Sequence, residues 1–363
     1  MRKLRYLDLL LSPFDLVRTK RVLQVNPTVP PERKEPENIQ IIVYEFDKDK
    51  TECLNLSRVE DTFRFLDTAA NTWINIDGLR KADVEKVCNH FGIHQLISED
   101  ILSIGQRPKM DEINGLLFCL MYMLYFNEEQ SSVETEQISI ILGKNFVISF
   151  QEDANRDVFN SLRDKIKLSG SKVRVQGADF LFYSLIDMIV DHFYIVMERL
   201  GERIELLEED ILRNASQRSL VKINTLRKEM IVLKRNIAPV REIINGILRS
   251  ENELIQERTE KYFKDVYDHV IQAYDLSENY RDMMMNLQDL YLNTVNLKLN
   301  EVMKVMAIVT CLLAPATVIG GIFGMNFETI PLLHNHWGFF ISVGLMLFIP
   351  VWMIIVFKRR GWF

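Results

Sequence analysis

The sequence predicts an α/β domain, then long charged helices, then a C-terminal hairpin of two membrane-spanning helices. Three observations support this fold class. Short β-rich runs mix with helical patterns up to about residue 150. From Ala178 onward the pattern is helical and strongly charged. Two apolar stretches, residues 305–323 and 338–357, contain no charged residue.

The first 38 residues are expected to form an N-terminal arm and a proline-rich linker. The arm begins with basic residues, but Asp8 and Pro13 interrupt its apolar stretch, so it does not read as a secretory signal. Two interpretations stay open: an amphipathic arm at the membrane surface, and a plain ordered N-terminus. The prolines between Pro27 and Pro36 indicate the linker.

Residues 39–170 are expected to form the α/β domain. Their apolar and β-branched runs are bounded by polar and glycine-containing segments, as strands are. The predicted strands are residues 39–46, 72–77, 116–126, 137–142 and 146–150, and the predicted helices are residues 82–91 and about 155–167.

Two helical segments follow. Residues 171–250 are expected to form antiparallel helices, and residues 251–326 a long pore-lining helix that includes the first span, 305–323. Residues 247–314 contain neither glycine nor proline, so a continuous helix there would be about 100 Å long. A monomer buries such a helix poorly, and we therefore expect self-association.

Each apolar stretch is close to the ~20 residues that cross a bilayer as a helix. The external loop, residues 327–337, is too short for a domain, so both ends of the hairpin return to one side. Lys298 and Lys304 precede the first span and a basic tail, residues 358–363, follows the second, whereas the loop has no Lys or Arg. Positive charge stays in the cytoplasm. A multi-pass cell-membrane protein with cytoplasmic termini is predicted.

Composition narrows the function classes. The net charge of −6 argues against nucleic acid as a partner, because proteins bind the negatively charged phosphates of nucleic acids with basic surfaces. The four cysteines are scattered, which is typical of reduced structural thiols. No phosphate-binding loop or paired-histidine zinc motif is present, and an enzyme is therefore not expected.

The first span carries a polar stripe. Its members recur every seven residues and so share one helical face. They are Met303, Thr310, Thr317 and Gly324, with Asn300 just below and Asn326 just above. Two spans cannot wall a pore within one chain, but a ring of copies could, with the first span inside and membrane lipid against the second.

Two other interpretations of this face stay open. A threonine in a membrane helix often bonds only its own backbone. Gly320 and Gly324 also form a GxxxG pair, which favours close helix packing. Pro315 would free a carbonyl one turn earlier and allow a kink.

Neither span contains Asp or Glu, so an ion pathway here would use neutral oxygens. Mg²⁺ dehydrates reluctantly and keeps several waters. Amide and carbonyl oxygens can accept hydrogen bonds from that water shell without removing it. This span therefore favours a hydrated divalent cation, Mg²⁺ first, over softer metals.

The sequence resembles the CorA-type magnesium transport proteins. The motif Gly-Met-Asn-Phe-Glu follows a span with Pro315 and precedes a short loop and a last span that ends in Lys and Arg. Further similar segments lie at residues 91–94, 99–102, 106–109, 262–269 and 300–305.

The resemblance implies a homopentamer whose long helices form a cytosolic funnel and whose first span lines the pore. Gly324, Met325 and Asn326 would form the outer selectivity filter. Thr317 and Thr310 would line the pore below it. Met303 and Met306 would form hydrophobic gate rings, and Asn300 would lie at the inner mouth.

The resemblance also implies regulation by intracellular Mg²⁺. Asp100 and Asp265 match an acidic pair that binds Mg²⁺ between neighbouring subunits, and Asp268 and Glu99 would assist. On their own, these aspartates read as helix caps or as partners of Lys264 or Lys109.

The chain departs from the family's pattern at three positions. Ala314 precedes Pro315 where some relatives have Met, Leu332 stands where relatives often have Glu, and Phe323 stands where Tyr is common. The role of His334 and His336 in the loop is open. Cys88, His90 and His94 are expected to be structural.

Other functions stay open as well. The same architecture could transport Co²⁺, Ni²⁺ or Zn²⁺, although zinc-exporting relatives tend to have Val where Met325 stands. A membrane-anchored helical sensor or scaffold is the alternative from another class. An anchor needs only apolar bulk, so the polar stripe argues against it.

Overall fold

The structure, a computed structural model, describes residues 35–36, 39–153, 156–250, 252–326, 330–332 and 335–362. The chain divides into two compact units. The first unit comprises residues up to 207 and residues 221–285, and the second comprises residues 208–220 and 286–363. The predicted N-terminal arm lies outside the described residues.

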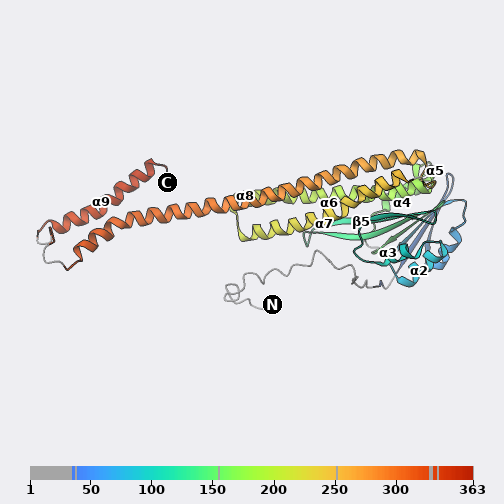
Figure 1. Cartoon of the computed structure of the whole chain (residues 1–363), viewed down its shortest axis with the longest axis horizontal. Helices are drawn as coiled ribbons and strands as arrows, with labels where there is room; N and C mark the ends of the chain where they lie inside the picture. The colour runs from blue at the N-terminus through green and yellow to red at the C-terminus, as the bar shows by residue number, and fades with distance from the viewer. Residues whose placement is uncertain are drawn as a thin grey trace. The chain divides into compact units, whose positions relative to one another are not determined.

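The first unit contains a β-sheet, in which Figure 1 labels β5. The sheet is mixed and has seven strands in the order β2-β1-β3-β7-β6-β5-β4. The central strands β3 and β7 are parallel, and the other neighbouring pairs are antiparallel. The strands are β1 (Gln40–Phe46), β2 (Thr51–Leu56), β3 (Asn71–Asp77), β4 (Lys109–Ile113), β5 (Leu116–Asn127), β6 (Ser132–Leu142) and β7 (Phe146–Gln151).

The two faces of the sheet differ in chemistry, because successive side chains of a strand point to opposite sides. On β3, Ile74 and Ile76 belong to the hydrophobic core that packs against η1 (Val59–Phe65), α2 (Lys81–His90) and α3 (Gln95–Leu102). The alternate residues of β3 face the other side. There the ring of Trp73 meets the ring of Phe159 and the guanidinium of Arg163. Both come from the region of α4 (Asn160–Lys167).

The predicted strands are found, but two more strands exist. β2 and β4 are the edge strands of the sheet, and both are rich in polar residues and half exposed. An edge strand buries little, so its sequence carries a weak hydrophobic pattern. The predicted helix at 82–91 matches α2, and α4 begins at Asn160, later than about 155.

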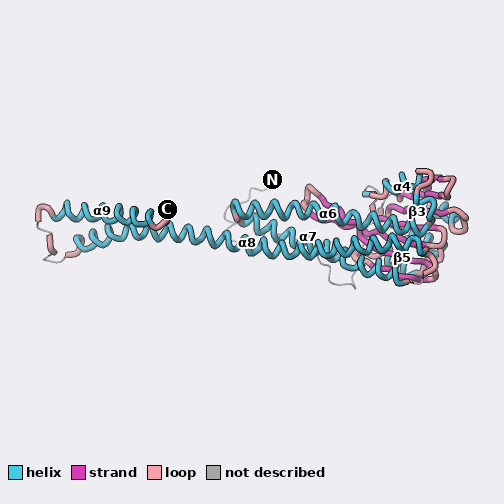
Figure 2. Tube along the Cα trace, turned by 90° about the horizontal axis from the view of Figure 1, so that it is seen from above, coloured by secondary structure: helices cyan, strands magenta, loops and turns pink. Residues whose placement is uncertain are grey.

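Three long helices follow α5 (Lys172–Gln176), and Figure 2 shows them as extended tubes. They are α6 (Ala178–Asn214), α7 (Gln217–Arg249) and α8 (Glu257–Phe323). A helix that is continuous over residues 247–314 does not form, because the chain breaks between Arg249 at the end of α7 and Glu257 at the start of α8. The oxygen Oδ1 of Asn252 accepts a hydrogen bond from the amide of Leu254, a local turn that competes with helix. α8 then continues through Pro315 without interruption.

A buried side chain fixes where α8 begins. Oδ2 of Asp179, near the start of α6, accepts hydrogen bonds from the Gln256 amide at 3.2 Å and the Thr259 hydroxyl at 2.6 Å. Helix N-termini leave backbone donors unpaired, and carboxylates satisfy them well. Aromatic contacts between Phe182 and Phe263 continue the packing of α6 on α8.

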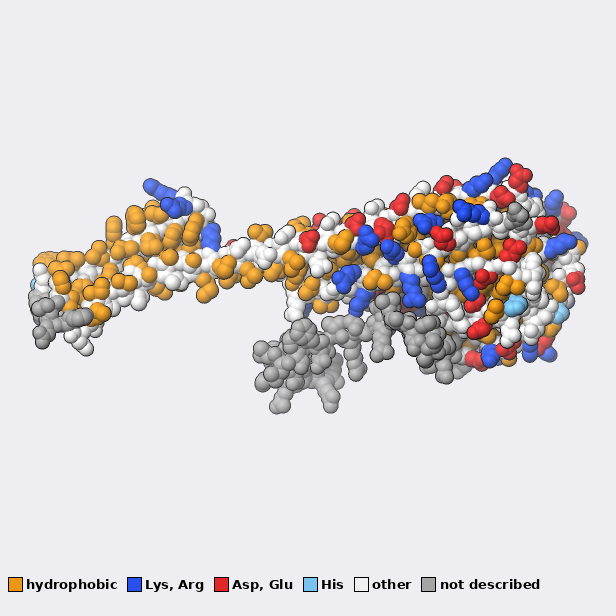
Figure 3. All heavy atoms as spheres, in the orientation of Figure 1, with side chains coloured by type: hydrophobic (Ala, Val, Ile, Leu, Met, Phe, Trp, Pro, Cys, Tyr) orange, Lys and Arg blue, Asp and Glu red, His pale blue; other side chains and the backbone are white. Residues whose placement is uncertain are grey.

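The second unit contains the membrane hairpin, formed by the end of α8 and by α9 (Gly338–Arg359). Among the described residues, three helices are long and apolar enough to span a membrane. The apolar window of α6 is 67% buried within the protein, whereas those of α8 and α9 are 6% buried. Figure 3 shows hydrophobic side chains covering both helices, with basic residues at one end of α9.

The turn before α9 depends on a glycine. A Cβ at Gly338 would lie 2.1 Å from the backbone oxygen of Leu332, so no larger residue fits there without a shift. Leu332 itself has a φ of 69°, in the left-handed region that non-glycine residues rarely adopt. The loop is therefore locally tight at its second half.

Candidate ion pathway and cation sites

The proposed pore residues are exposed within one chain, as most of the first span is. Met303 and Met306 on α8 are 61% and 66% exposed, although both are large and apolar. The other predicted pore residues are exposed as well: Asn300, Thr310, Thr317, Gly324, Met325 and Asn326. A single hairpin leaves this stripe without cover, as a pore wall shared among copies requires.

The hydroxyl groups of the two threonines in the stripe donate hydrogen bonds to the backbone of their own helix. The hydroxyl of Thr310 donates to the carbonyl of Met306 at 2.8 Å, and that of Thr317 donates to the carbonyl of Leu313 at 3.0 Å. The backbone bonding that the sequence left open is therefore present. Each hydroxyl oxygen still has lone pairs to accept a hydrogen bond. A hydrated cation, whose waters donate, is a suitable partner.

The glycine pair of this span does not face one partner. A Cβ at Gly320 would lie 3.7 Å from the side chain of Met346 on α9, so Gly320 faces the second helix of the hairpin. Gly324 instead lies against the Gly320 carbonyl of its own helix, and its amide donates to that carbonyl at 3.0 Å. Packing within the chain thus accounts for Gly320 without covering the polar stripe.

In the first unit, Asp100 and Glu99 lie on α3. The ammonium of Lys109 lies 2.5 Å from Oδ2 of Asp100 and 3.3 Å from Oδ2 of Asp111. Asp100 is mostly buried, with 13% of its side chain exposed, and Glu99 is exposed. Within one chain Asp100 is therefore an ion-pair partner of Lys109, one of the two lysines that the sequence suggested.

Asp265 and Asp268 are exposed on α8. Asp265 is close enough to Asp187 on α6 to raise the pKa of that carboxyl. The expectation that Asp265 meets Asp100 concerns two subunits, and it stays a prediction.

A cluster that the sequence reasoning missed lies beside Asp265. Possible ligand atoms of Asp187, Asp191 and His269 lie within 4.8 Å of one another, the one such group of three among the described residues. The spacing of these residues in the sequence could have indicated the cluster. Asp187 and Asp191 are four residues apart on α6, and Asp265 and His269 are four apart on α8, so each pair shares a helix face. Only the packing of α6 on α8 brings the two pairs together.

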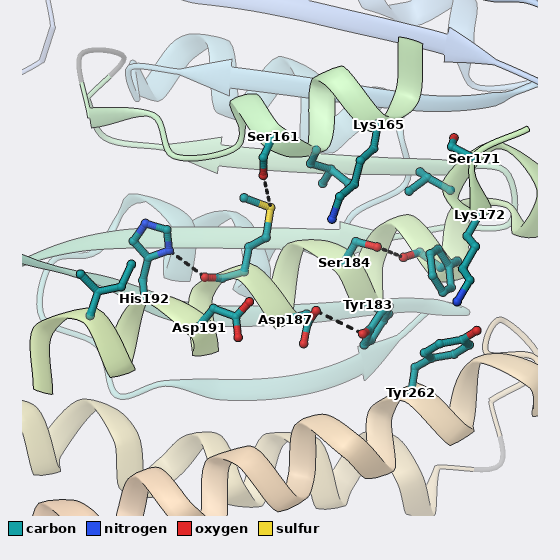
Figure 4. Close-up of a pocket in the computed structure, with 15 residues that line it drawn as sticks. Ser161, Lys165, Ser171, Lys172, Tyr183, Ser184, Asp187, Asp191, His192 and Tyr262 are labelled. Carbon is teal, nitrogen blue, oxygen red and sulfur yellow. Dashed lines mark hydrogen bonds between the residues drawn. The ribbon is translucent and has the colours of Figure 1, made fainter. Parts of the chain in front are cut away.

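The cluster borders a cavity of about 580 Å³ between α4, α5, α6 and α8. Figure 4 shows Asp187 and Asp191 side by side on α6, with the Tyr183 hydroxyl directed at Asp187. That hydroxyl donates to Oδ2 of Asp187 at 3.1 Å. Burial, and then the neighbouring Asp191 carboxylate, raise the pKa of Asp187. Two carboxylates and an imidazole at this spacing suit a divalent cation that neutralises them.

Of the two loop histidines, the structure describes His336. His336 is exposed, and His334 and Glu328 lie outside the described residues. Cys88 is buried in the hydrophobic core, and His90 stacks on the ring of Phe63, so both have structural surroundings.

Comparison with known proteins identifies the family. Residues 68–359 match the family described as CorA-like Mg²⁺ transporter protein, which is most of the chain. The chain belongs to the CorA-like Mg²⁺ transporter family. Members of this family are transporters and channels, not enzymes, and the chain is a membrane protein with C-terminal spanning helices.

Two relatives illustrate the breadth of the family. The cobalt/magnesium transport protein CorA of Thermotoga maritima is 37% identical over 327 residues, which cover 90% of this chain and 93% of that protein. The putative metal ion transporter YfjQ of Bacillus subtilis is 29% identical and covers 80% of this chain and 89% of its own length.

Solved structures show the same fold. The complete structure of the CorA magnesium transporter from Methanocaldococcus jannaschii has a TM-score of 0.73 at 22% identity. The match covers 89% of this chain and 98% of that one. The full-length CmaX protein has a TM-score of 0.67 at 17% identity. The predicted fold class is confirmed by these matches.

Proposed function

We propose that this protein carries Mg²⁺ across the cell membrane through a pore lined by α8 from several copies of the chain. The observation that carries the proposal is the exposed polar stripe of the first span, which ends in Gly324-Met325-Asn326. An apolar membrane helix exposes such a stripe to a partner rather than to lipid. The partner that fits is a second α8, and a pentamer is the assembly that the family resemblance implies.

The selectivity of this pore follows from neutral oxygens. Asn326 would present one amide oxygen per subunit to a hydrated cation at the outer mouth. Because neither span holds a carboxylate, the ion would be recognised through its water shell rather than bound directly. A cytosol-negative potential favours uptake by roughly 4.6 kcal/mol per 100 mV for a doubly charged ion.

Regulation would depend on the cytosolic carboxylates. Mg²⁺ bound by Asp100 and Asp265 across a subunit interface, with Glu99 and Asp268 nearby, would hold the closed state. A second possible cation site lies beside Asp265 and is formed by Asp187, Asp191 and His269. When intracellular Mg²⁺ falls, uncompensated carboxylates repel, and α8 would carry that change to Met303 and Met306. A hydrophobic constriction at these methionines would then hydrate and conduct.

One observation favours Co²⁺ or Ni²⁺ as additional ions bound at the cluster of Asp187, Asp191 and His269. His269 supplies an imidazole to the acidic cluster, and imidazole suits these metals better than it suits Mg²⁺. The relative from Thermotoga maritima also has both cobalt and magnesium in its name.

The direct test is ion flux into proteoliposomes that contain the purified full-length chain. Mg²⁺, Co²⁺, Ni²⁺ and Zn²⁺ are offered separately, with an inside-negative potential. We expect Mg²⁺ uptake that stops when the internal Mg²⁺ concentration is raised. Uptake of Zn²⁺ without Mg²⁺ would reject the assigned cargo, and no uptake of any of the four would reject the transport proposal.

A further inference from the structure

A buried polar cluster lies on the sheet of the first unit, outside the proposed ion pathway. It is built on the parallel strands β3 and β7, where Asp77 and Gln151 are partners in register. Both side chains are almost fully buried, at 1% and 0% exposed. Asn75 and Ser149, one pair back along the strands, are also 0% exposed.

Most of the hydrogen bonds in this cluster are satisfied. The indole of Trp73 donates to Ser149, and the Ser149 hydroxyl donates to Oδ1 of Asn75 at 2.6 Å. Asn75 donates to Oδ1 of Asp77 at 2.9 Å. The amide of Gln151 also donates to Oδ1 of Asp77, at 2.8 Å. One oxygen of Asp77 therefore accepts two hydrogen bonds.

The remaining oxygens of this pair are unsatisfied. Oδ2 of Asp77 and Oε1 of Gln151 are both buried, and neither has a hydrogen-bond donor among the described residues. Burying a polar atom without a partner costs about 1–3 kcal/mol. Both atoms are acceptors, so what each of them lacks is a hydrogen-bond donor.

The charged groups around Asp77 favour the protonated form of its carboxyl group. The charged groups that act on Asp77 are Asp157, just before α4, and Arg163, on α4. Arg163 already forms a salt bridge with Asp157, and its ring neighbour is Trp73. Two carboxylates therefore share one guanidinium, and an ionised Asp77 would leave one negative charge uncompensated. From β1, Tyr44 stacks on Trp73, and burial raises the pKa of its phenol to about 12, so it stays neutral.

We propose that Asp77 and Gln151 form a buried proton-binding site, a carboxylic acid–amide pair. The proton sits on Oδ2 of Asp77 and is donated to Oε1 of Gln151, while the Gln151 amide donates back to Oδ1. Burial, followed by the Asp157 carboxylate, raises the pKa of Asp77 to about 6. The site therefore binds its proton in mildly acidic conditions and loses it at neutral pH.

The sign of the linkage follows from that shift. A carboxyl whose pKa rises from 3.8 to about 6 on folding stabilises the fold below pH 3.8, relative to higher pH. That stabilisation is lost as the pH rises to 6. Asp77→Asn keeps an amide that can donate to Gln151 without a charge, so its stability will not contain this pH-dependent part.

The test compares thermal unfolding of full-length wild type and Asp77→Asn in detergent at pH 4.5 and 7.5. The measured quantity is the melting temperature of Asp77→Asn minus that of wild type. We expect this difference to be about 3–6 °C higher at pH 7.5 than at pH 4.5. Asp164→Asn, which removes an exposed carboxylate on α4, is the matched control and will show no such gain. A difference that is the same at both pH values would overturn the proposal.

A second measurement needs no variant. Infrared spectra of wild type with ¹³C-labelled aspartate will show the carbonyl band of a buried, protonated aspartic acid at pH 5. The band will disappear with a midpoint near pH 6. Absence of a labelled band that titrates in this range would reject the proton site even if Asp77→Asn does not fold.

Discussion

The ammonium of Lys109 lies 2.5 Å from the carboxylate of Asp100, the residue expected to bind regulatory Mg²⁺. In a single chain, lysine therefore holds the place that a cation would take. In the proposed function, a metal that binds Asp100 would have to compete with this ion pair, so Lys109 would set the intracellular Mg²⁺ concentration at which the regulatory site fills.

Replacing Lys109 with Met removes that competitor while keeping an unbranched apolar side chain. We predict that Mg²⁺ will protect the cytosolic helices from protease at a concentration roughly 10-fold lower, because one charge-assisted contact no longer has to be displaced. Lys81→Met, at an exposed position on α2, is the control. An unchanged half-protection concentration in Lys109→Met would place Asp100 outside the regulatory site.

Replacing Asp100 and Asp265 together with Asn should have the opposite effect. The two amides keep the size of the side chains but remove the charge that holds the ion, so protection will need more Mg²⁺ and flux will respond less to internal Mg²⁺. Lys at both positions separates charge balance from coordination, since a fixed positive charge can imitate bound metal. If the aspartates only cap helices or form ion pairs, thermal stability will fall while half-protection stays the same.

The cluster of Asp187, Asp191 and His269 gives a pH dependence. Burial and Asp191 raise the pKa of Asp187, so acidification protonates it sooner than an exposed aspartate. A metal binds the ionised carboxylate, and cation affinity at this cluster will therefore fall as the pH falls. We predict that Co²⁺ binding, followed by calorimetry, weakens from pH 7.5 to 5.5 in wild type. In His269→Ala and in Asp187→Asn, the affinity for Co²⁺ should be low at both pH values. If these variants bind Co²⁺ as tightly as wild type does, the cluster does not supply the ligands.

The Asp179 carboxylate is predicted to hold the start of α8. Asp179→Ala removes the acceptor of the buried Thr259 hydroxyl and of the Gln256 amide, which costs about 2 kcal/mol. We expect a lower melting temperature and faster amide exchange over residues 256–263. Asp179→Asn keeps an acceptor oxygen and should lose less. Equal exchange in Asp179→Ala and wild type would show that the cap does not position α8.

The sequence was sufficient for the parts of the fold with strong patterns. The long strand β5 was identified because burial of both its faces leaves an apolar run, and the two charge-free spans were identified because a helix that faces lipid is apolar along its length. The edge strands β2 and β4 were not predicted, because half-exposed strands keep polar residues and so have a weak hydrophobic pattern. The turn that makes the break between α7 and α8 was not predicted either, because it depends on Asn252 and on the distant Asp179 rather than on glycine or proline.

The candidate site divides in the same way. The pore stripe was visible because its residues repeat along one helix. The cluster of Asp187, Asp191 and His269 was not, because it joins two helices whose pairing only the fold supplies. The neighbour of Asp100 also needed the structure: Lys109 lies on β4, which the sequence did not reveal as a strand.

Self-association can be measured independently of transport. In the proposed pore, other copies of the chain would cover the exposed stripe of α8, and native mass spectrometry of the detergent-solubilised protein should show a homo-oligomer, with a pentamer expected. A stable monomer that still conducts ions would contradict a pore built from several copies.

The most direct test of the central claim is Mg²⁺ uptake into proteoliposomes by Asn326→Ala, measured together with oligomer size. Asn296→Ala, an exposed amide of α8 outside the span, is the matched control. If Asn326 forms the outer filter, Asn326→Ala will assemble normally and will lose Mg²⁺ uptake, whereas Asn296→Ala will keep it. Wild-type uptake by a correctly assembled Asn326→Ala protein would contradict the account.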